Sequence, residues 1–137
     1  METEALVVRG LTRTYGKRAA VKDLDLNVSR GDIYGFLGPN GAGKTTAMRC
    51  MLGLIKRNAG SVSIFGETNL VRAHRHIGAI IETPTFHGWL SGRRNLELSC
   101  AYAGLSGAAA RKEIDRVLER VGLTERARDR AGGYSLG

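Results

Sequence analysis

The clearest chemical pattern in this chain is a glycine-rich run with one lysine and two threonines: Gly38, Pro39, Asn40, Gly41, Ala42, Gly43, Lys44, Thr45 and Thr46. It fits G-x-x-x-x-G-K-[ST], the loop that wraps the phosphates of a nucleoside triphosphate. Its glycines let the backbone approach the phosphates, and consecutive N–H groups form an anion nest at the positive end of a following helix. We expect Lys44 to reach the β- and γ-phosphates and the Thr45 hydroxyl to ligate Mg²⁺. The alternative is a glycine-rich turn that fits by chance.

The segments on either side of this loop fit a strand that enters it and a helix that leaves it. Residues 32–37 are almost continuously apolar, which is typical of a strand covered on both faces in the middle of a sheet. Residues 46–52 are predicted to be a helix. A strand, a phosphate loop and a helix in this order form a nucleotide-binding motif, so the context favours phosphate binding over a chance turn.

Four more segments predict strands around this motif. Residues 5–11 and 21–28 alternate apolar and polar side chains, as half-buried strands do. Residues 61–66 are predicted to be a short strand, and residues 77–81 a further buried one. The sequence therefore predicts an α/β fold, with a P-loop NTPase core and an antiparallel β region at its N-terminus.

The last third of the chain predicts helices. Residues 95–102 and 108–121 have helical patterns, and the second has four apolar residues on one face: Ile114, Val117, Leu118 and Val121. We therefore divide the chain into a nucleotide-binding core, residues 1–91, and a helical segment, residues 92–137.

The composition is that of an ordinary globular chain, with 137 residues, 42% hydrophobic and 25% charged. No apolar run approaches the length of a membrane span, so we expect any membrane role to come through a partner. The charged N-terminus has no apolar stretch of the kind that directs secretion. Cys50 and Cys100 fall in predicted helices without metal-ligand spacing, which indicates reduced core cysteines of a cytosolic protein.

The net charge of +8 raises the question of a nucleic-acid or membrane partner. Most of the excess is arginine spread along the chain, with a local cluster at Arg126, Arg128 and Arg130. Aromatic residues do not interleave with this cluster, as a platform for stacking single-stranded bases requires. A solvated helix face is therefore the favoured interpretation.

With these motifs, almost the whole chain resembles the nucleotide-binding domain of ABC (ATP-binding cassette) transporters. Tyr15, in the run Thr-Arg-Thr-Tyr-Gly, resembles the family's aromatic residue that stacks on adenine. The alternative is an exposed tyrosine that closes a turn. Residues 78–86, followed by Leu90, Ser91 and Gly92, are similar to the segment that joins the family's catalytic core to its helical subdomain.

Glu82 stands where most of the family has Gln, and Glu followed by Thr-Pro is similar to the bacitracin- and lantibiotic-export subgroup. The family's Gln senses Mg²⁺ and the γ-phosphate and contacts the membrane subunit. The resemblance therefore implies that Glu82 is an Mg²⁺ ligand with a catalytic role beside Lys44. The alternative is a solvated loop acid.

Tyr134, Ser135, Leu136 and Gly137 resemble the opening of the family's signature loop, in the variant form of those exporters. The resemblance implies that Ser135 and the Gly137 N–H face the γ-phosphate of ATP held by a second subunit. It also implies an Mg²⁺-holding Asp, a neighbouring Glu base and a later His. No segment after the phosphate loop matches these groups, so the chain is expected to be the front portion of an ATPase that binds ATP without hydrolysing it.

The leading hypothesis is the ATP-binding subunit of an ABC exporter, using ATP and Mg²⁺. We expect it to pair with a second ATP-binding subunit and to lie on the cytoplasmic face of the membrane, against a transmembrane permease. The alternative is a soluble ABC-type ATPase that acts on nucleic acid or ribosomes, which the basic charge would suit. A small GTPase is disfavoured because the sequence has no Asn-Lys-x-Asp stretch for guanine.

Overall fold

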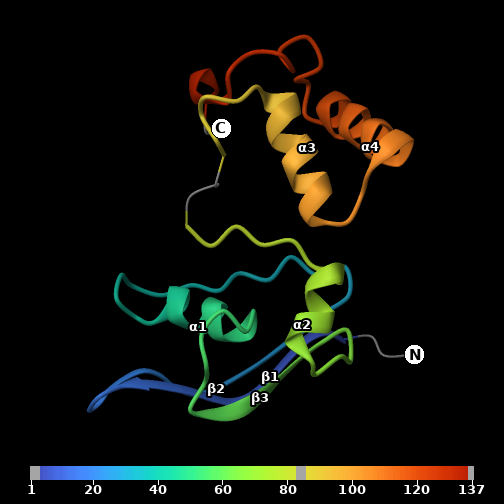
Figure 1. Ribbon diagram of the computed structural model, residues 1–137. Coiled ribbons are helices and arrows are strands. Elements are labelled where there is room, and N and C mark those ends of the chain that lie inside the picture. The colour runs from blue at the N-terminus through green and yellow to red at the C-terminus, as the bar shows by residue number, and fades with distance from the viewer. Residues whose placement is uncertain (1–3, 83–85, 136–137) are drawn as a thin grey trace. The chain divides into compact units, whose positions relative to one another are not determined.

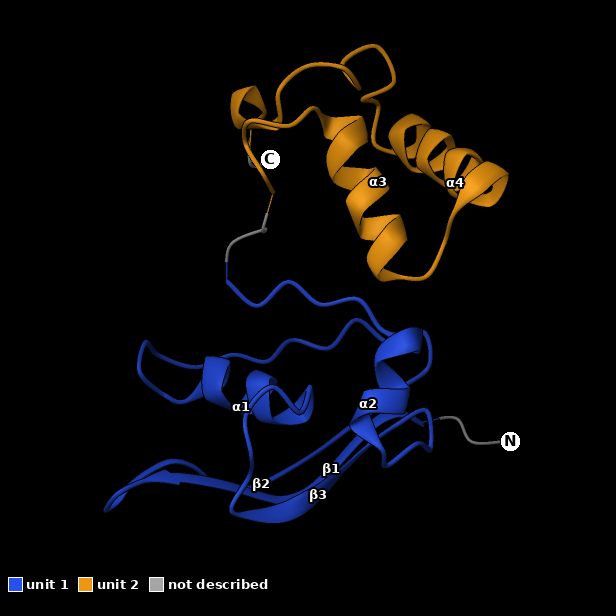
Figure 2. Cartoon of the chain, viewed as in Figure 1, with its two compact units in different colours: residues 1–83 blue, residues 84–137 orange. Residues whose placement is uncertain are grey.

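The computed structural model describes residues 4–82 and 86–135. The chain divides into two compact units, residues 1–83 and residues 84–137 (Figure 2). The functional division after residue 91 stays a prediction.

The first unit contains a three-stranded antiparallel sheet. Strands β1 (Glu4–Tyr15) and β2 (Arg18–Ser29) form a hairpin, and β3 (Ala59–Ile64) pairs with the other edge of β1, which gives the order β2-β1-β3. These strands confirm the predictions for residues 5–11, 21–28 and 61–66. The alternation of side chains lets each strand bury one face.

Two helices cover one face of this sheet (Figure 1): α1 (Lys44–Met51) and α2 (Leu70–Ala73), which continues into the 3₁₀ turn η1 (His74–His76). The core lies between these layers and consists of Val8, Leu11, Val21, Leu26, Ala47, Cys50, Met51, Val62, Ile64 and Ala73. Because α1 contributes three of these side chains, packing fixes its start close to the β1–β2 hairpin. Cys50 is a free, buried cysteine, as predicted.

The two buried strands predicted from apolar runs, one before the phosphate loop and one after β3, are absent from the structure. Residues 32–37 and 77–81 form no strand, and Ile33 and Leu37 are fully or almost fully exposed, at 103% and 91%. A strand requires a neighbour that accepts and donates its backbone hydrogen bonds. Within residues 4–82 neither segment has such a neighbour, so these two predictions were wrong even though the apolar patterns are present.

The second unit is built on two helices, α3 (Gly92–Tyr102) and α4 (Gly107–Arg120), followed by the 3₁₀ turn η2 (Ala131–Gly133). Its core contains Cys100, Ile114, Leu118 and Ala127. These helices confirm the predictions for residues 95–102 and 108–121. The Ser91 hydroxyl caps α3 by accepting from the Arg94 N–H at 3.2 Å.

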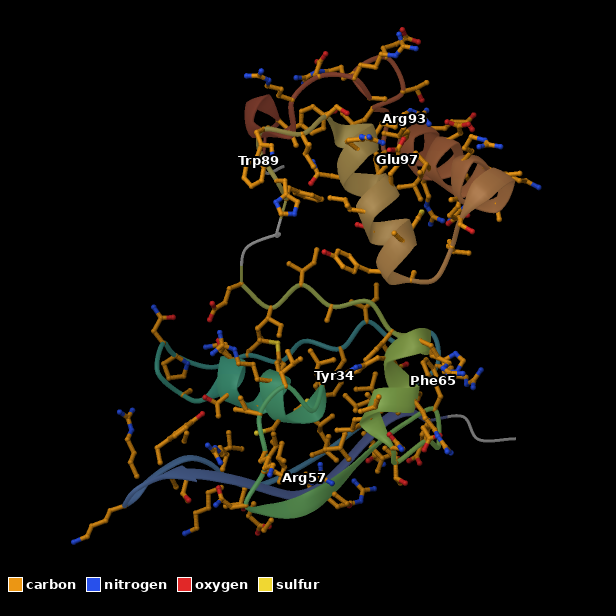
Figure 3. All side chains as sticks on the ribbon, in the orientation of Figure 1. Tyr34, Arg57, Phe65, Trp89, Arg93 and Glu97 are labelled. Carbon is orange, nitrogen blue, oxygen red and sulfur yellow. The ribbon has the colours of Figure 1, made fainter. Side chains whose placement is uncertain are left out.

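Polar contacts join α3 to α4 and to the segment that precedes α3. Arg93 extends from α3 toward α4, where it pairs with Asp115 (Figure 3). Asn95, the buried polar residue of α3, accepts from the His87 N–H at 2.8 Å and donates to the His87 carbonyl at 3.1 Å. The start of α3 is thereby tied to the segment before it. None of the helices in the described residues is long and apolar enough to pass through a bilayer.

Candidate nucleotide-binding site

The glycine-rich loop closes around the side chain of Lys44, its own lysine. The Lys44 Nζ donates to the carbonyl oxygen of Gly38 and, at 2.7 Å, to that of Pro39. The Ala42 N–H donates to the same Pro39 carbonyl at 3.2 Å, which makes a tight turn. The ammonium group is therefore held within the loop, where the sequence motif requires a cation for phosphate.

The loop ends at the N-terminus of α1, and this terminus has no side-chain cap. The first N–H groups of a helix have no intrahelical acceptor, and they carry the positive end of the helix dipole. Asn69 caps α2 and Ser91 caps α3, whereas α4, like α1, has no side-chain cap. No acidic residue lies in the first turn of α1. These N–H groups are thus available to an anion.

Gly43 allows the loop to pass directly beneath the β-hairpin. Its φ of +87° is the left-handed conformation that side chains disfavour. A Cβ atom added there would lie 1.9 Å from the carbonyl oxygen of Ala20 on β2, which is far inside contact distance. Glycine at position 43 therefore brings the start of α1 against β2.

A cavity of about 460 Å³ opens between the hairpin and the loop. Its lining combines three residues of the hairpin with six of the loop and α1: Tyr15, Arg18, Ala20, Asn40, Gly41, Gly43, Lys44, Thr45 and Thr46. Seven of these nine residues were predicted from the sequence. The other two, Arg18 and Ala20, belong to no sequence motif. Arg18 enters the lining because it pairs with Tyr15 across the two-residue turn of the hairpin.

This lining fits a nucleotide better than it fits a neutral ligand. Tyr15 at one end is 49% exposed as a residue and so offers an aromatic surface to a base. The other end has the Lys44 ammonium and the uncapped start of α1, which suit phosphates. None of the nine lining residues is acidic. Thr45 also lines the cavity, and its hydroxyl is the oxygen ligand that this residue offers to an Mg²⁺ ion bound with the phosphates.

Glu82 lies elsewhere in the first unit and does not line this cavity. Its carboxylate faces Arg49 of α1, with 3.3 Å between Oε1 and the Arg49 Nη2, and both side chains are largely exposed. The structure thus brings the phosphate loop and Tyr15 together but does not add Glu82 to them. The role of Glu82 at the metal stays a prediction.

The predicted signature-loop residues belong to the second unit. Tyr134 is anchored there, because its hydroxyl donates to the Arg126 carbonyl at 2.6 Å and its ring packs against Gly92. A Cβ at Gly92 would lie 2.4 Å from the Tyr134 oxygen, so glycine makes room for the ring. Ser135 follows directly and is exposed. Gly137 lies outside the described residues.

Comparison with known proteins identifies the class to which this fold and site belong. Residues 21–137 match the sequence profile of the family described as "ABC transporter", which covers most of the chain. The chain belongs to the ABC transporter family. This agrees with the P-loop NTPase fold and with the resemblance derived from the motifs.

Two relatives and one solved structure define the likeness further. The bacitracin transport ATP-binding protein BcrA of Bacillus licheniformis is 46% identical over 130 residues, which are 93% of this chain and 42% of that protein. BcrA of Enterococcus faecalis is 42% identical over 130 residues, 93% of this chain and 41% of that protein. A solved ATP-binding subunit of an ABC transporter has a TM-score of 0.80 at 28% identity, with 96% of this chain and 56% of that one covered.

These matches confirm the predicted resemblance to the bacitracin-export subgroup. They give no support to the alternative of an ATPase that acts on nucleic acid or ribosomes. The chain spans less than half the length of the two BcrA proteins that it matches.

Proposed function

We propose that this chain is the nucleotide-binding part of the ATP-binding subunit of an ABC-type exporter. The observation that carries the proposal is the acid-free cavity, which joins an exposed tyrosine to the phosphate loop and the uncapped start of α1. The names of the BcrA relatives, which are transport ATP-binding proteins, support the role in export.

Each part of the cavity has a distinct task in binding ATP. The Tyr15 ring stacks on adenine, and the N–H groups at the start of α1 bind phosphate oxygens. Lys44 exchanges the carbonyls of Gly38 and Pro39 for the β- and γ-phosphates, because an ammonium–phosphate contact is stronger than one with a neutral carbonyl. Mg²⁺, when bound with ATP, neutralises phosphate charge, and the Thr45 hydroxyl is the ligand that this cavity offers it.

The same proposal includes the partners. A transmembrane permease would receive the subunit on the cytoplasmic face of the membrane, and a second ATP-binding subunit would complete each ATP site. In that arrangement Ser135 and Gly137 serve the ATP of the partner subunit. The exposure of Ser135, which follows the anchored Tyr134, supports such a contact.

These 137 residues are expected to bind ATP but not to hydrolyse it. Hydrolysis needs a group that positions water and further stabilisation of charge on the departing phosphate. The cavity lining contains no carboxylate or histidine that could act on water. We therefore assign hydrolysis to the full-length subunit and nucleotide binding to this part of it.

Calorimetric titration of the purified chain with Mg·ATP tests the proposal. ATP should bind, and Lys44→Ala should abolish most of the affinity, because the N–H groups alone cannot replace the lost charge. Phosphate release by the chain should equal that of the Lys44→Ala variant. Unchanged ATP affinity in Lys44→Ala would contradict the assignment of the site, and Lys44-dependent multiple turnover would contradict the division of binding from hydrolysis.

A further inference from the structure

We infer that Arg18 is a second cation for the bound nucleotide and that it contacts the α-phosphate. The inference rests on the proposed function, since it takes ATP as the ligand of the cavity. Neither the sequence motifs nor the names of the relatives point to this residue.

The hairpin places Arg18 beside the residue that faces the base. Tyr15 and Arg18 are direct partners across the two-residue turn that joins β1 to β2. Side chains of directly opposed residues project from the same face of an antiparallel pair. Both residues accordingly line the same cavity. Arg18 is therefore next to the base-binding end rather than on the outside of the hairpin.

The same strand then leads to the phosphate loop. Ala20 is two residues after Arg18 at an irregularity in the pairing of β1 with β2, and both residues line the cavity. A strand rises about 3.3 Å per residue, or roughly 7 Å over this step. The Ala20 carbonyl is the group that packs against Gly43, at the start of α1. One wall of the cavity thus runs from Tyr15 and Arg18, which are cross-strand partners, through Ala20 to the helix N-terminus.

A nucleotide in this cavity has its base at one end of that wall and its β- and γ-phosphates at the other. The α-phosphate joins the two parts of the molecule, and Arg18 is the cation that lines the cavity on the side of the base, opposite Tyr15. The guanidinium group is suited to this task because it can donate two parallel hydrogen bonds to phosphate oxygens.

Charge also favours this assignment. Within residues 4–82 and 86–135, no carboxylate lies within ion-pair distance of Arg18. Lys44, the other cation of the cavity, is held at the loop by two carbonyl groups. Arg18 thus contributes to the cavity a positive charge that is not neutralised by a neighbouring carboxylate.

Titration calorimetry on three forms of the chain tests the inference: Arg18→Gln, Arg18→Lys and the control Lys17→Gln. Lys17 lies in the turn beside Arg18 but does not line the cavity, so its replacement removes the same charge without the contact. Each form is titrated with Mg·ATP and with ADP. Circular dichroism and the thermal midpoint establish that each variant is folded.

We expect Arg18→Gln to lower the affinity for ATP and the affinity for ADP each on the order of tenfold, the scale of one hydrogen bond to a charged group. The ratio of the two affinities should stay constant because both ligands carry the α-phosphate. Arg18→Lys should recover part of the loss, and Lys17→Gln should bind like the unsubstituted chain.

Equal losses in Arg18→Gln and Lys17→Gln would overturn the inference, because they would show a general effect of charge. A loss for ATP without a loss for ADP would also overturn it by assigning Arg18 to the γ-phosphate. If ATP binding depends on Lys44 but the affinity is unchanged in Arg18→Gln, the inference about Arg18 is wrong and the proposed function still holds. If the unsubstituted chain binds no ATP, the proposed function fails and the inference fails with it.

Discussion

The guanidinium carbon of Arg13 lies 4.4 Å from the centroid of the Tyr15 ring. The two residues are two positions apart on β1 and so share one face of the strand. The Arg13 Nε is buried and has no hydrogen-bond partner within the described part of the chain. Arg13 therefore covers one face of the ring, and the exposed part of the tyrosine is left to receive a base.

Replacement of Tyr15 tests whether the ring binds adenine. Tyr15→Ala should lose roughly 1–2 kcal/mol of ATP binding free energy, the scale of a base–aromatic stack. Tyr15→Trp should lose little, because it keeps an aromatic face. Inorganic triphosphate is the control ligand, and calorimetry gives both affinities. If triphosphate binding falls as much as ATP binding in Tyr15→Ala, stacking is the wrong explanation.

Replacement of Arg13 tests whether the guanidinium orients that ring. Arg13→Met keeps a long side chain but removes the cation. It should reduce the free energy of ATP binding by about 0.5–1 kcal/mol, the size of an exposed cation–π contact. Lys22→Met, which removes a charge from the exposed surface of β2, is the matched control. Equal losses in the two variants would mean that net charge, and not the position of the ring, sets the affinity.

The sequence predicted local elements well because their determinants are local. Alternation identified β1 and β2, and helical periodicity identified α3 and α4. Residues 32–37 and 77–81 were wrongly predicted to be strands. An apolar run indicates a tendency to be buried, but it does not show that a neighbouring strand is available for pairing. The short helix α2 was missed, since its four residues carry too little periodicity to detect.

The site shows the same division between local and distant information. The phosphate loop is one continuous motif, so its residues could be assigned from spacing. Tyr15 needed the family resemblance, because a single tyrosine before a turn has no specific pattern. Arg18 could not be assigned, because its place in the cavity follows from cross-strand pairing with Tyr15 and from the contact of Ala20 with Gly43. Such contacts between segments are properties of the fold.

The close contact at Gly43 predicts a difference between two glycines of the same loop. Gly41 and Gly43 both have φ above +80°, but a Cβ at Gly41 would meet nothing within 4 Å. Gly41→Ala should therefore cost only the backbone strain, about 1–2 kcal/mol. Gly43→Ala adds the clash with the Ala20 carbonyl, so its thermal midpoint and ATP affinity should fall further. Equal effects of the two substitutions would show that the contact between the Ala20 carbonyl and position 43 does not limit the size of the side chain there.

The buried thiol of Cys50 predicts a loss of stability in alkaline solution. Burial raises the pKa of Cys50 above its ordinary value of 9.0, although the charges of Arg13 and Arg57 act in the opposite direction. Because the unfolded chain loses this proton first, the free energy of unfolding should be constant below that value and fall as pH rises beyond it. Urea unfolding at neutral and alkaline pH measures the effect. The fall should be smaller in Cys50→Ala, and an identical fall in both chains would contradict the assignment.

The exposed pair between Glu82 and Arg49 leads to a prediction for the full-length subunit. An exposed ion pair contributes about 0–1 kcal/mol, so Glu82 can leave Arg49 at little cost. A carboxylate near the γ-phosphate is tolerable when Mg²⁺ lies between the two negative groups, since otherwise they repel. Glu82→Gln should thus weaken the dependence of ATP binding on Mg²⁺ and leave metal-free binding equal or better.

ATP affinity, measured over a series of Mg²⁺ concentrations and in a chelator, provides the test. Arg49→Gln is the matched control, because it breaks the same ion pair but keeps the carboxylate. This variant should keep the full dependence on Mg²⁺. If Arg49→Gln and Glu82→Gln behave alike, the ion pair and not the metal explains the effect. A stronger dependence on Mg²⁺ in Glu82→Gln would rule out the carboxylate as a ligand and leave Glu82 as a solvated partner of Arg49.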